Sequence, residues 1–379
     1  YAAANEGTQL GEMSRFLTQL MVEYSPCDSA QGLLSAETTI ERFVLDMKGE
    51  IKPVTPFTAP KSAQVVRTLR ERYDVAYEHE KEAVTYLSPS ALNTYIACPM
   101  QFYFQYVVGL RVEDEFSEDV DSRLFGSIFH KSMELLYSPY VGKSDLQGDE
   151  IRQIAANKAL LEKTIDSAFA SEFFNVPRAK IESYKPSYTG EQLITRAVIL
   201  EYIKKQLLFD ARCCPMSILG LETRKFDYVQ AVELADGAEL KVRLGGIIDR
   251  LDYASLPATV DANGVMTRTS SDRFVRVVDY KTSSASQTVK TISDLFNGED
   301  HTMAPYILQT CYYSYVLAQN DNFKNSKVKP QLMYVKILNR QDDADVKIGS
   351  EPLLDFGHQA IEGHLLMSEF ATHLVGVIR

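Results

Sequence analysis

Cysteine is scarce and irregularly placed in this sequence. Five cysteines occur among 379 residues, and no two of them form a Cys-x-x-Cys pair. An odd and irregular set argues against a disulfide framework. It also argues against a zinc site built from this chain alone. We therefore expect reduced thiols and a cytoplasmic location.

Long apolar runs and an excess of basic charge are missing as well. No apolar run reaches the roughly 18 residues of a membrane-spanning helix, and no secretory pattern opens the chain, so we expect no membrane partner. Residue 1 is Tyr, which suggests a fragment of a longer intracellular protein. The 40 Lys plus Arg against 51 Asp plus Glu give a net charge of −11. Binding of nucleic acid would therefore require a local basic groove, metal ions or a partner subunit.

The chain divides into a short N-terminal region and a longer domain. Residues 13–22 have a helical period, and three prolines within 50–64 indicate an extended connector. Residues 64–84 then resume a charged helical pattern or a strand. We place the boundary near 83, with 1–83 as an N-terminal helical extension and 84–379 as the main domain.

Helical and strand periods follow one another in a definite order within 84–379. Helices are expected at 88–98 and 125–138, and about three more between 150 and 212. The later elements are strands at 217–229 and 239–252 joined by a turn at 236–237, a strand at 273–281, a helix at 305–319, a strand at 330–338 and a helix at 357–377. This order predicts an α/β fold, a small mixed sheet flanked by helices with a large helical insertion.

Asp279-Tyr280-Lys281 carries the strongest chemical signal. The triplet ends an apolar strand, in which residues i and i+2 point to the same side, so Asp279 and Lys281 leave the strand together. Asp249 lies at the end of the preceding apolar run. Charges at such positions are costly without partners, and two carboxylates repel unless a cation lies between them. Two carboxylates beside an ammonium suit a divalent metal that activates water against a phosphodiester.

These charged residues also have purely structural interpretations. Asp249 could pair with Arg250 or cap a turn. Asp279 and Lys281 could form a surface ion pair.

The other candidate residues have structural alternatives too. Glu222 could pair with Arg224 or with the lysine after it. His130 could be a hydrogen-bonded core histidine. Gln309 and Tyr313 share a helix face and would be ordinary helix residues without a substrate.

Six segments together resemble the PD-(D/E)XK nuclease superfamily, specifically its RecB/AddB-type branch. The resemblance covers roughly 85–377 and depends on Ser88 to Phe104 (SPSALNTYIACPMQFYF), Gly126 to His130 (GSIFH), Glu222, Gly246 to Asp252 (GIIDRLD), Val278 to Thr282 (VDYKT) and Gln309 to Tyr313 (QTCYY). It implies a restriction-endonuclease-like core.

The implied activity is that of a Mg²⁺- or Mn²⁺-dependent deoxyribonuclease that cuts single-stranded DNA or duplex ends. Such an enzyme would be the exonuclease part of a helicase–nuclease in double-strand break repair and recombination, with a helicase partner subunit. The alternatives are a stand-alone RecB-like exonuclease and a catalytically silent nuclease-fold scaffold that binds DNA or a partner.

The resemblance also implies a role for each matching residue. Asp249 and Asp279 would be the main metal ligands, His130 a further ligand, and the Tyr280 carbonyl would complete part of the ligand sphere. Lys281 would orient the attacking water and stabilise charge on the phosphate. The remaining residues are a further catalytic carboxylate inside or just outside the ligand sphere, Glu222, and three that would contact DNA or support the site, Gln309, Tyr313 and Arg250.

Two features depart from the RecB/AddB pattern. In AddB-type relatives, a cysteine at the position of Cys98 joins three cysteines beyond the last helix to hold a [4Fe–4S] cluster, which needs four ligands. No cysteine follows Cys311 here, so a cluster would require cysteines beyond Arg379 in a longer parent protein. Residues 8–21 resemble the tail of a helicase-like module, with an unrelated helical linker as the alternative.

Overall fold

The computed structural model describes most of the chain beyond residue 57. Described are Phe16 and Gln19 and the ranges 58–77, 85–110, 120–143, 145–260, 266–267, 272–283, 287–298, 304–338, 344–353, 355–357 and 361–379. Contacts divide the chain into two units, 1–58 and 59–379, and the fold below is that of the second. Phe16 and Gln19 are helical. The rest of the helix predicted at 13–22 lies outside the described residues, and the boundary predicted near 83 stays a prediction.

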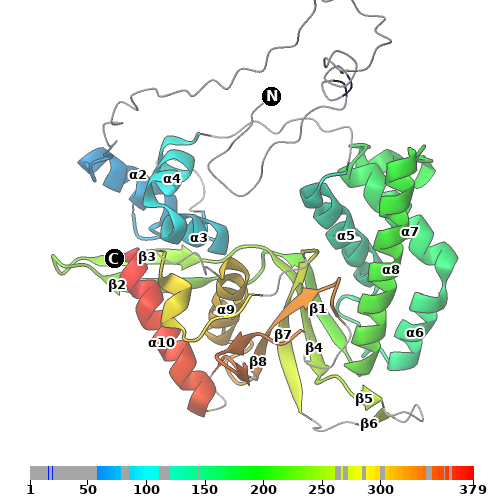
Figure 1. Cartoon of the computed structure of the whole chain (residues 1–379). Helices are drawn as coiled ribbons and strands as arrows, with labels where there is room; N and C mark the ends of the chain where they lie inside the picture. The colour runs from blue at the N-terminus through cyan, green and yellow to red at the C-terminus, as the bar shows by residue number, and fades with distance from the viewer. Residues whose placement is uncertain are drawn as a thin grey trace, which may run out of the picture. The chain divides into compact units, whose positions relative to one another are not determined.

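A four-stranded mixed sheet forms the centre of this unit (Figure 1). Its order is β1-β4-β7-β8; the first two pairings are antiparallel and β7 pairs with β8 in parallel. The strands are β1 (Ser217–Thr223), β4 (Ile248–Ser255), β7 (Arg273–Lys281) and β8 (Val328–Tyr334). Strand β7 is apolar on both sides because it is central. Val277 belongs to the core on one face and Val278 to the core on the other.

Helices cover both faces of the sheet, as the α/β prediction required (Figure 1). One face packs against the helical insertion: α5 (Ser122–Tyr137), α6 (Gly148–Ala156), α7 (Lys158–Glu172) and α8 (Gly190–Arg212). The other packs against α3 (Pro89–Ala97), α9 (Pro305–Ala318) and α10 (Ile361–Ile378). The fold is thus a mixed α/β fold of the restriction-endonuclease-like kind. Within the described residues, no helix is long and apolar enough to cross a membrane.

The helix starts follow from their capping residues. The Ser88 side chain accepts a hydrogen bond from the Ala91 N–H at the start of α3, and Asp121 does the same for the Leu124 N–H at the start of α5. Helix α5 therefore begins three residues before the predicted 125. The remaining helical segments are α2 (Ala63–Tyr73), α4 (Pro99–Phe102), the π-helix η1 (Tyr103–Val108), and the 3₁₀ segments η2 (Ser138–Tyr140), η3 (Arg178–Ser183) and η4 (Ser293–Phe296).

The two long strands predicted at 217–229 and 239–252 are wrong as continuous strands. Each is broken in two, and the inner halves, β2 (Tyr228–Glu233) and β3 (Glu239–Leu244), form a separate hairpin with its turn at 236–237, as predicted. Gly245 lies in the second break, and the close approach of the Tyr86 ring requires glycine there, because a Cβ would lie 2.6 Å from that ring. The other short strands are β5 (Thr259–Val260), β6 (Met266–Thr267), β9 (Lys347–Ile348) and β10 (Glu351–Pro352).

Candidate metal centre and active site

The end of β7 places its polar side chains as the alternation predicts. Asp279 is 3% exposed, and its carboxylate faces Lys281 and helix α9. Tyr280 points to the other side, where its ring packs edge-on against Phe129 at 5.6 Å. The end of β7 therefore presents the Asp279 carboxylate and the Lys281 ammonium together on one face of the sheet.

Asp249 joins this site from the neighbouring strand. It is the second residue of β4 rather than the end of a strand, which corrects the sequence-based placement. Because β4 runs antiparallel to β7, the start of β4 lies beside the end of β7. The Asp249 Oδ2 accepts a hydrogen bond of 3.0 Å from the Tyr280 N–H. The carboxylate is thereby fixed against the Asp279-Tyr280-Lys281 backbone.

His130 reaches the same point from α5. Its Nε2 lies 3.0 Å from the Tyr280 carbonyl oxygen, and its Nδ1 lies 3.3 Å from Asp249 Oδ2. A neutral imidazole carries one N–H and can donate to only one of these two acceptors. A cation near the imidazole and the carboxylate would satisfy the remaining nitrogen lone pair. This geometry fits a metal site better than it fits an ordinary core histidine.

Glu222 comes to the site through an unusual backbone conformation. Its φ of 42° lies in the left-handed region, which non-glycine residues rarely adopt and which marks functional sites when the surrounding structure enforces it. The ligand atoms of His130, Glu222 and Asp249 all lie within 4.8 Å of one another. Among the described residues, the Glu222 side chain has no ion pair, so the predicted alternative of a pair with Arg224 or the lysine after it is wrong.

Electrostatics of the site favour a bound cation. Partial desolvation of the Glu222 carboxyl, whose residue as a whole is exposed, and then the charge of Asp249 raise the pKa of Glu222 to about 7. The same two causes raise the pKa of Asp279 to about 7, although Lys281 opposes them. Two carboxylates, Glu222 and Asp249, and an imidazole form the group of ligand atoms, and Asp279 lies beside it without belonging to it. Mostly oxygen ligands suit Mg²⁺ or Mn²⁺. The residues therefore fit the divalent metal that the sequence implied.

Lys281 and Gln309 complete a hydrogen-bonded group around Asp279. The Lys281 Nζ lies 2.6 Å from Asp279 Oδ2 and donates to Gln309 Oε1 at 3.5 Å. The Gln309 Nε2 in turn donates to Asp279 Oδ1 at 3.0 Å. Gln309 thus holds one carboxylate oxygen of Asp279, whereas the buried Oδ2 has the Lys281 ammonium beside it but accepts no hydrogen bond among the described residues.

Two predicted support residues are placed differently from Gln309. Tyr313 is 6% exposed, and a Cβ at Gly246 would lie 2.6 Å from its hydroxyl, so the tyrosine braces the link between β3 and β4. Burial and the charges of Asp249 and Asp279 raise its pKa. Its low exposure leaves bracing as the better of the two predicted roles.

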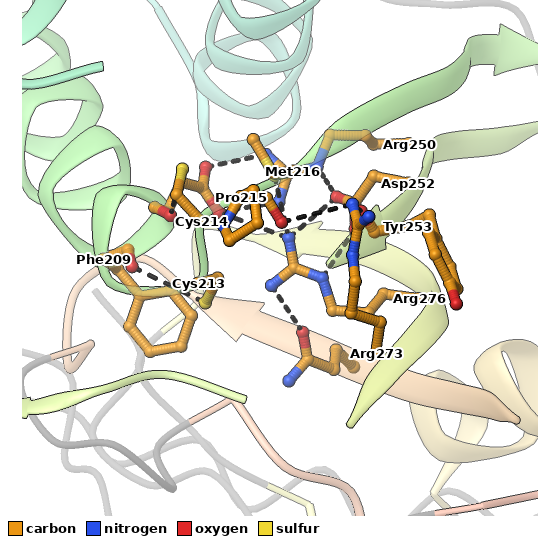
Figure 2. A network of polar contacts seen from close by, with 12 residues as sticks. Phe209, Cys213, Cys214, Pro215, Met216, Arg250, Asp252, Tyr253, Arg273 and Arg276 are labelled. Carbon is orange, nitrogen blue, oxygen red and sulfur yellow. Dashed lines mark hydrogen bonds and ion pairs between the residues drawn. The ribbon is translucent and has the colours of Figure 1, made fainter. Parts of the chain in front are cut away.

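Arg250 is completely buried on the far side of β4. Its guanidinium binds both carboxylate oxygens of Asp210 at 2.7 and 2.8 Å and lies 2.9 Å from Asp252. Figure 2 shows Arg250 and Asp252 in one polar network with Arg276. Arg250 also lies 5.4 Å from the centre of the Tyr280 ring. It therefore cannot reach DNA, which excludes that half of the prediction, and its placement behind Asp249 and Tyr280 suits a supporting role.

A cleft of about 890 Å³ opens onto these residues. His130, Glu222, Tyr280 and Lys281 line it. Residues that the sequence did not suggest also line it, and they include Arg123, Lys131, Tyr306 and Lys336. Helix spacing could have indicated Tyr306, since it precedes Gln309 by three positions. The lining is mixed in charge: Glu134 and Glu172 lie in it beside these basic residues, and Lys131 pairs with Glu134 at 2.7 Å.

Cys98 lies away from this site. It is exposed at the C-cap of α3. In the part of the chain that the structure describes, the single group of three ligating side chains contains no cysteine. The [4Fe–4S] cluster stays a prediction.

Comparison with known proteins gives one family. A family model described as the PD-(D/E)XK nuclease superfamily matches residues 86–368, well over half of the chain. The matched range contains every residue of the site above. Comparison with curated proteins found no match.

Proposed function

The chain belongs to the PD-(D/E)XK nuclease superfamily, and from that premise we propose that it is a Mg²⁺- or Mn²⁺-dependent deoxyribonuclease. The observation that carries the proposal is the approach of His130, Glu222 and Asp249 to within 4.8 Å, with His130 and Glu222 lining a cleft that also contains Lys281. Lys281 lies at the end of β7. Metal ligands and a cation for the phosphate thus face one space.

Each side chain has a defined task in this proposal. Asp249, Asp279 and His130 would hold the metal, with Glu222 and the Tyr280 carbonyl completing or supporting the ligand set. When bound, the metal would supply Lewis acidity and a water of lowered pKa. Lys281 places a positive charge where negative charge develops on the scissile phosphate, and it orients the attacking water.

Gln309 fixes the positions of Asp279 and Lys281 relative to each other. It donates to Asp279 Oδ1 and accepts from Lys281 Nζ, so a shift of either group disturbs both contacts. Tyr313 and Arg250 would support the backbone of β4 and β7 from opposite sides.

The finer assignment is a RecB/AddB-type nuclease. We propose an exonuclease that belongs to a cytoplasmic helicase–nuclease with a helicase partner and acts in double-strand break repair and recombination. What supports this is the order along the chain of His130, Glu222, Asp249, the Asp279-Tyr280-Lys281 triplet and the Gln309–Tyr313 pair. His130, Glu222 and Asp249 form one group, and Gln309 donates to Asp279. A stand-alone RecB-like exonuclease would use the same residues.

Cleavage of labelled DNA tests the proposal. The full chain is incubated with end-labelled single-stranded and duplex DNA, with Mn²⁺ or with EDTA. Lys281→Ala is the test variant, and Lys290→Ala, at an exposed lysine outside the cleft, is the matched control. We expect Mn²⁺-dependent cleavage that the first substitution abolishes and the second preserves.

Two results would contradict the proposal. No cleavage by the parent chain with either metal would favour the silent scaffold that binds DNA or a partner. Cleavage that persists in Lys281→Ala would refute the assigned site. Products of one nucleotide from a labelled end would support the exonuclease assignment, whereas long internal fragments would oppose it.

A further inference from the structure

The ring of Tyr306 contacts the ammonium of Lys281. The Lys281 Nζ lies 4.3 Å from the centre of the Tyr306 ring, well inside the range of a cation–π contact. Both residues line the active-site cleft. The Lys281 side chain is only 15% exposed, so the ring acts in a partly desolvated place, where such contacts are strongest.

The backbone around Tyr306 is anchored at several points. The Tyr306 N–H donates to Gln287 Oε1 at 2.9 Å, and the Gln287 N–H donates to the Tyr334 hydroxyl at 3.2 Å. The carbonyl of Pro305 accepts from Asn93 Nδ2 at 3.1 Å. These contacts connect the first turn of α9 to α3 and to the end of β8, so the ring is presented by a fixed element.

The other partners of the Lys281 ammonium are Asp279 and Gln309. Asp279 Oδ2 is its closest contact, at 2.6 Å, and Gln309 Oε1 lies 3.5 Å away. A metal on Asp279 would withdraw part of the negative charge that holds the ammonium. The ring of Tyr306 does not depend on that charge and still holds the ammonium at the cleft.

We propose that Tyr306 is a positioning residue whose ring holds the Lys281 ammonium toward the phosphate in the cleft. The inference rests on the proposed nuclease function for its role in catalysis, but the contact itself is independent of it. Its hydroxyl has no hydrogen bond among the described residues. The inference assigns the positioning role to the ring, which contacts the ammonium.

Two substitutions separate the ring from the hydroxyl. Tyr306→Leu removes the π face and keeps an apolar side chain, whereas Tyr306→Phe keeps the ring. Calorimetric unfolding of both variants checks that the fold is intact. The full chain is used throughout.

The first readout needs no activity. The metal-free proteins are acetylated briefly with an amine-reactive ester, and labelling at each lysine is quantified by mass spectrometry. We expect Lys281 to react about 2- to 5-fold faster in Tyr306→Leu, the factor that corresponds to loss of a cation–π contact. In Tyr306→Phe it should react as in the parent. Equal labelling of Lys281 in all three proteins would overturn the inference.

The second readout is cleavage kinetics. Tyr306→Leu should lower kcat roughly 5- to 30-fold, the range for a desolvated cation–π contact, with little change in KM, and Tyr306→Phe should restore most of the rate. A raised KM with unchanged kcat would overturn the inference, because it would make the ring a substrate-stacking surface. Faster labelling of Lys281 in a chain that never cleaves DNA would refute the proposed function and leave the Lys281–Tyr306 contact supported.

Discussion

Asp249→Asn should make the metal-free protein more stable and abolish its response to metal. Asp249 raises the pKa of both Glu222 and Asp279 by repulsion. The asparagine keeps the shape of the side chain and an oxygen for the Tyr280 N–H. The substitution removes only the negative charge of Asp249, which repels the carboxylates of Glu222 and Asp279.

The size of the effect follows from the distance and the solvent. Unit charges at the 4.8 Å limit of this cluster repel by about 3.5 kcal/mol at an effective dielectric of 20. Glu222 is exposed to solvent, which screens much of that energy, so we expect a net gain of about 1–2 kcal/mol. The measurement is made at pH 8, above the pKa of about 7 to which burial and Asp249 raise both Glu222 and Asp279, so that these two carboxylates are mostly ionised.

Differential scanning calorimetry at pH 8 measures both halves of the prediction. In EDTA, the Tm of Asp249→Asn should exceed that of the parent by a few degrees. With Mn²⁺ at about 100 times its Kd, the parent should gain about 2.7 kcal/mol and the variant nothing. Asp236→Asn, at an exposed turn, is the control and should leave both values unchanged. A variant that is less stable in EDTA, or that responds to Mn²⁺ like the parent, would refute the reasoning.

Three further predictions concern pH, the buried network and DNA affinity. Burial and Asp249 raise the pKa of Asp279 from an ordinary 3.8 to about 7 in the fold. In EDTA, its contribution to the free energy of unfolding is therefore complete below about pH 4 and is lost as the pH rises through about 7. Urea unfolding should accordingly show this contribution at pH 5 and its loss at pH 8. Mn²⁺ needs the ionised acid, so calorimetric titration should show weaker binding at pH 6 than at pH 8, and equal affinities would contradict the assignment. Asp210→Asn leaves the buried Arg250 short of a counter-charge and should cost about 3–5 kcal/mol in urea unfolding; a cost below about 1 kcal/mol would contradict the network. The net charge of −11 predicts weak, salt-sensitive binding of single-stranded DNA in Ca²⁺, and tight binding that persists at high salt would contradict it.

Local patterns were sufficient to predict most helices and the central strand. Ser88 marks a helix start by its own side chain, and the valines of β7 have apolar partners on both faces. The superfamily resemblance is confirmed over 86–368. The RecB/AddB branch, the partner and the repair role stay predictions.

Features that depend on contacts between segments far apart in the sequence could not be predicted from local patterns. The position of Asp249 at the start of β4 depends on antiparallel pairing with β7, which no local pattern encodes. The need for glycine at position 245 depends on the approach of the Tyr86 ring from another segment. The left-handed backbone of Glu222 is unfavourable for that residue type and could not be expected from propensity. The cation–π contact of Tyr306 likewise needs the packing of α9 on β7.

The position of a bound metal tests the central claim most directly. Crystals of the full chain grown with Mn²⁺ would be measured near the manganese absorption edge. The account predicts an anomalous peak about 2.1–2.4 Å from oxygens of Asp249 and Asp279 and a nitrogen of His130. No peak among these side chains, with Mn²⁺ bound elsewhere or not at all, would contradict it.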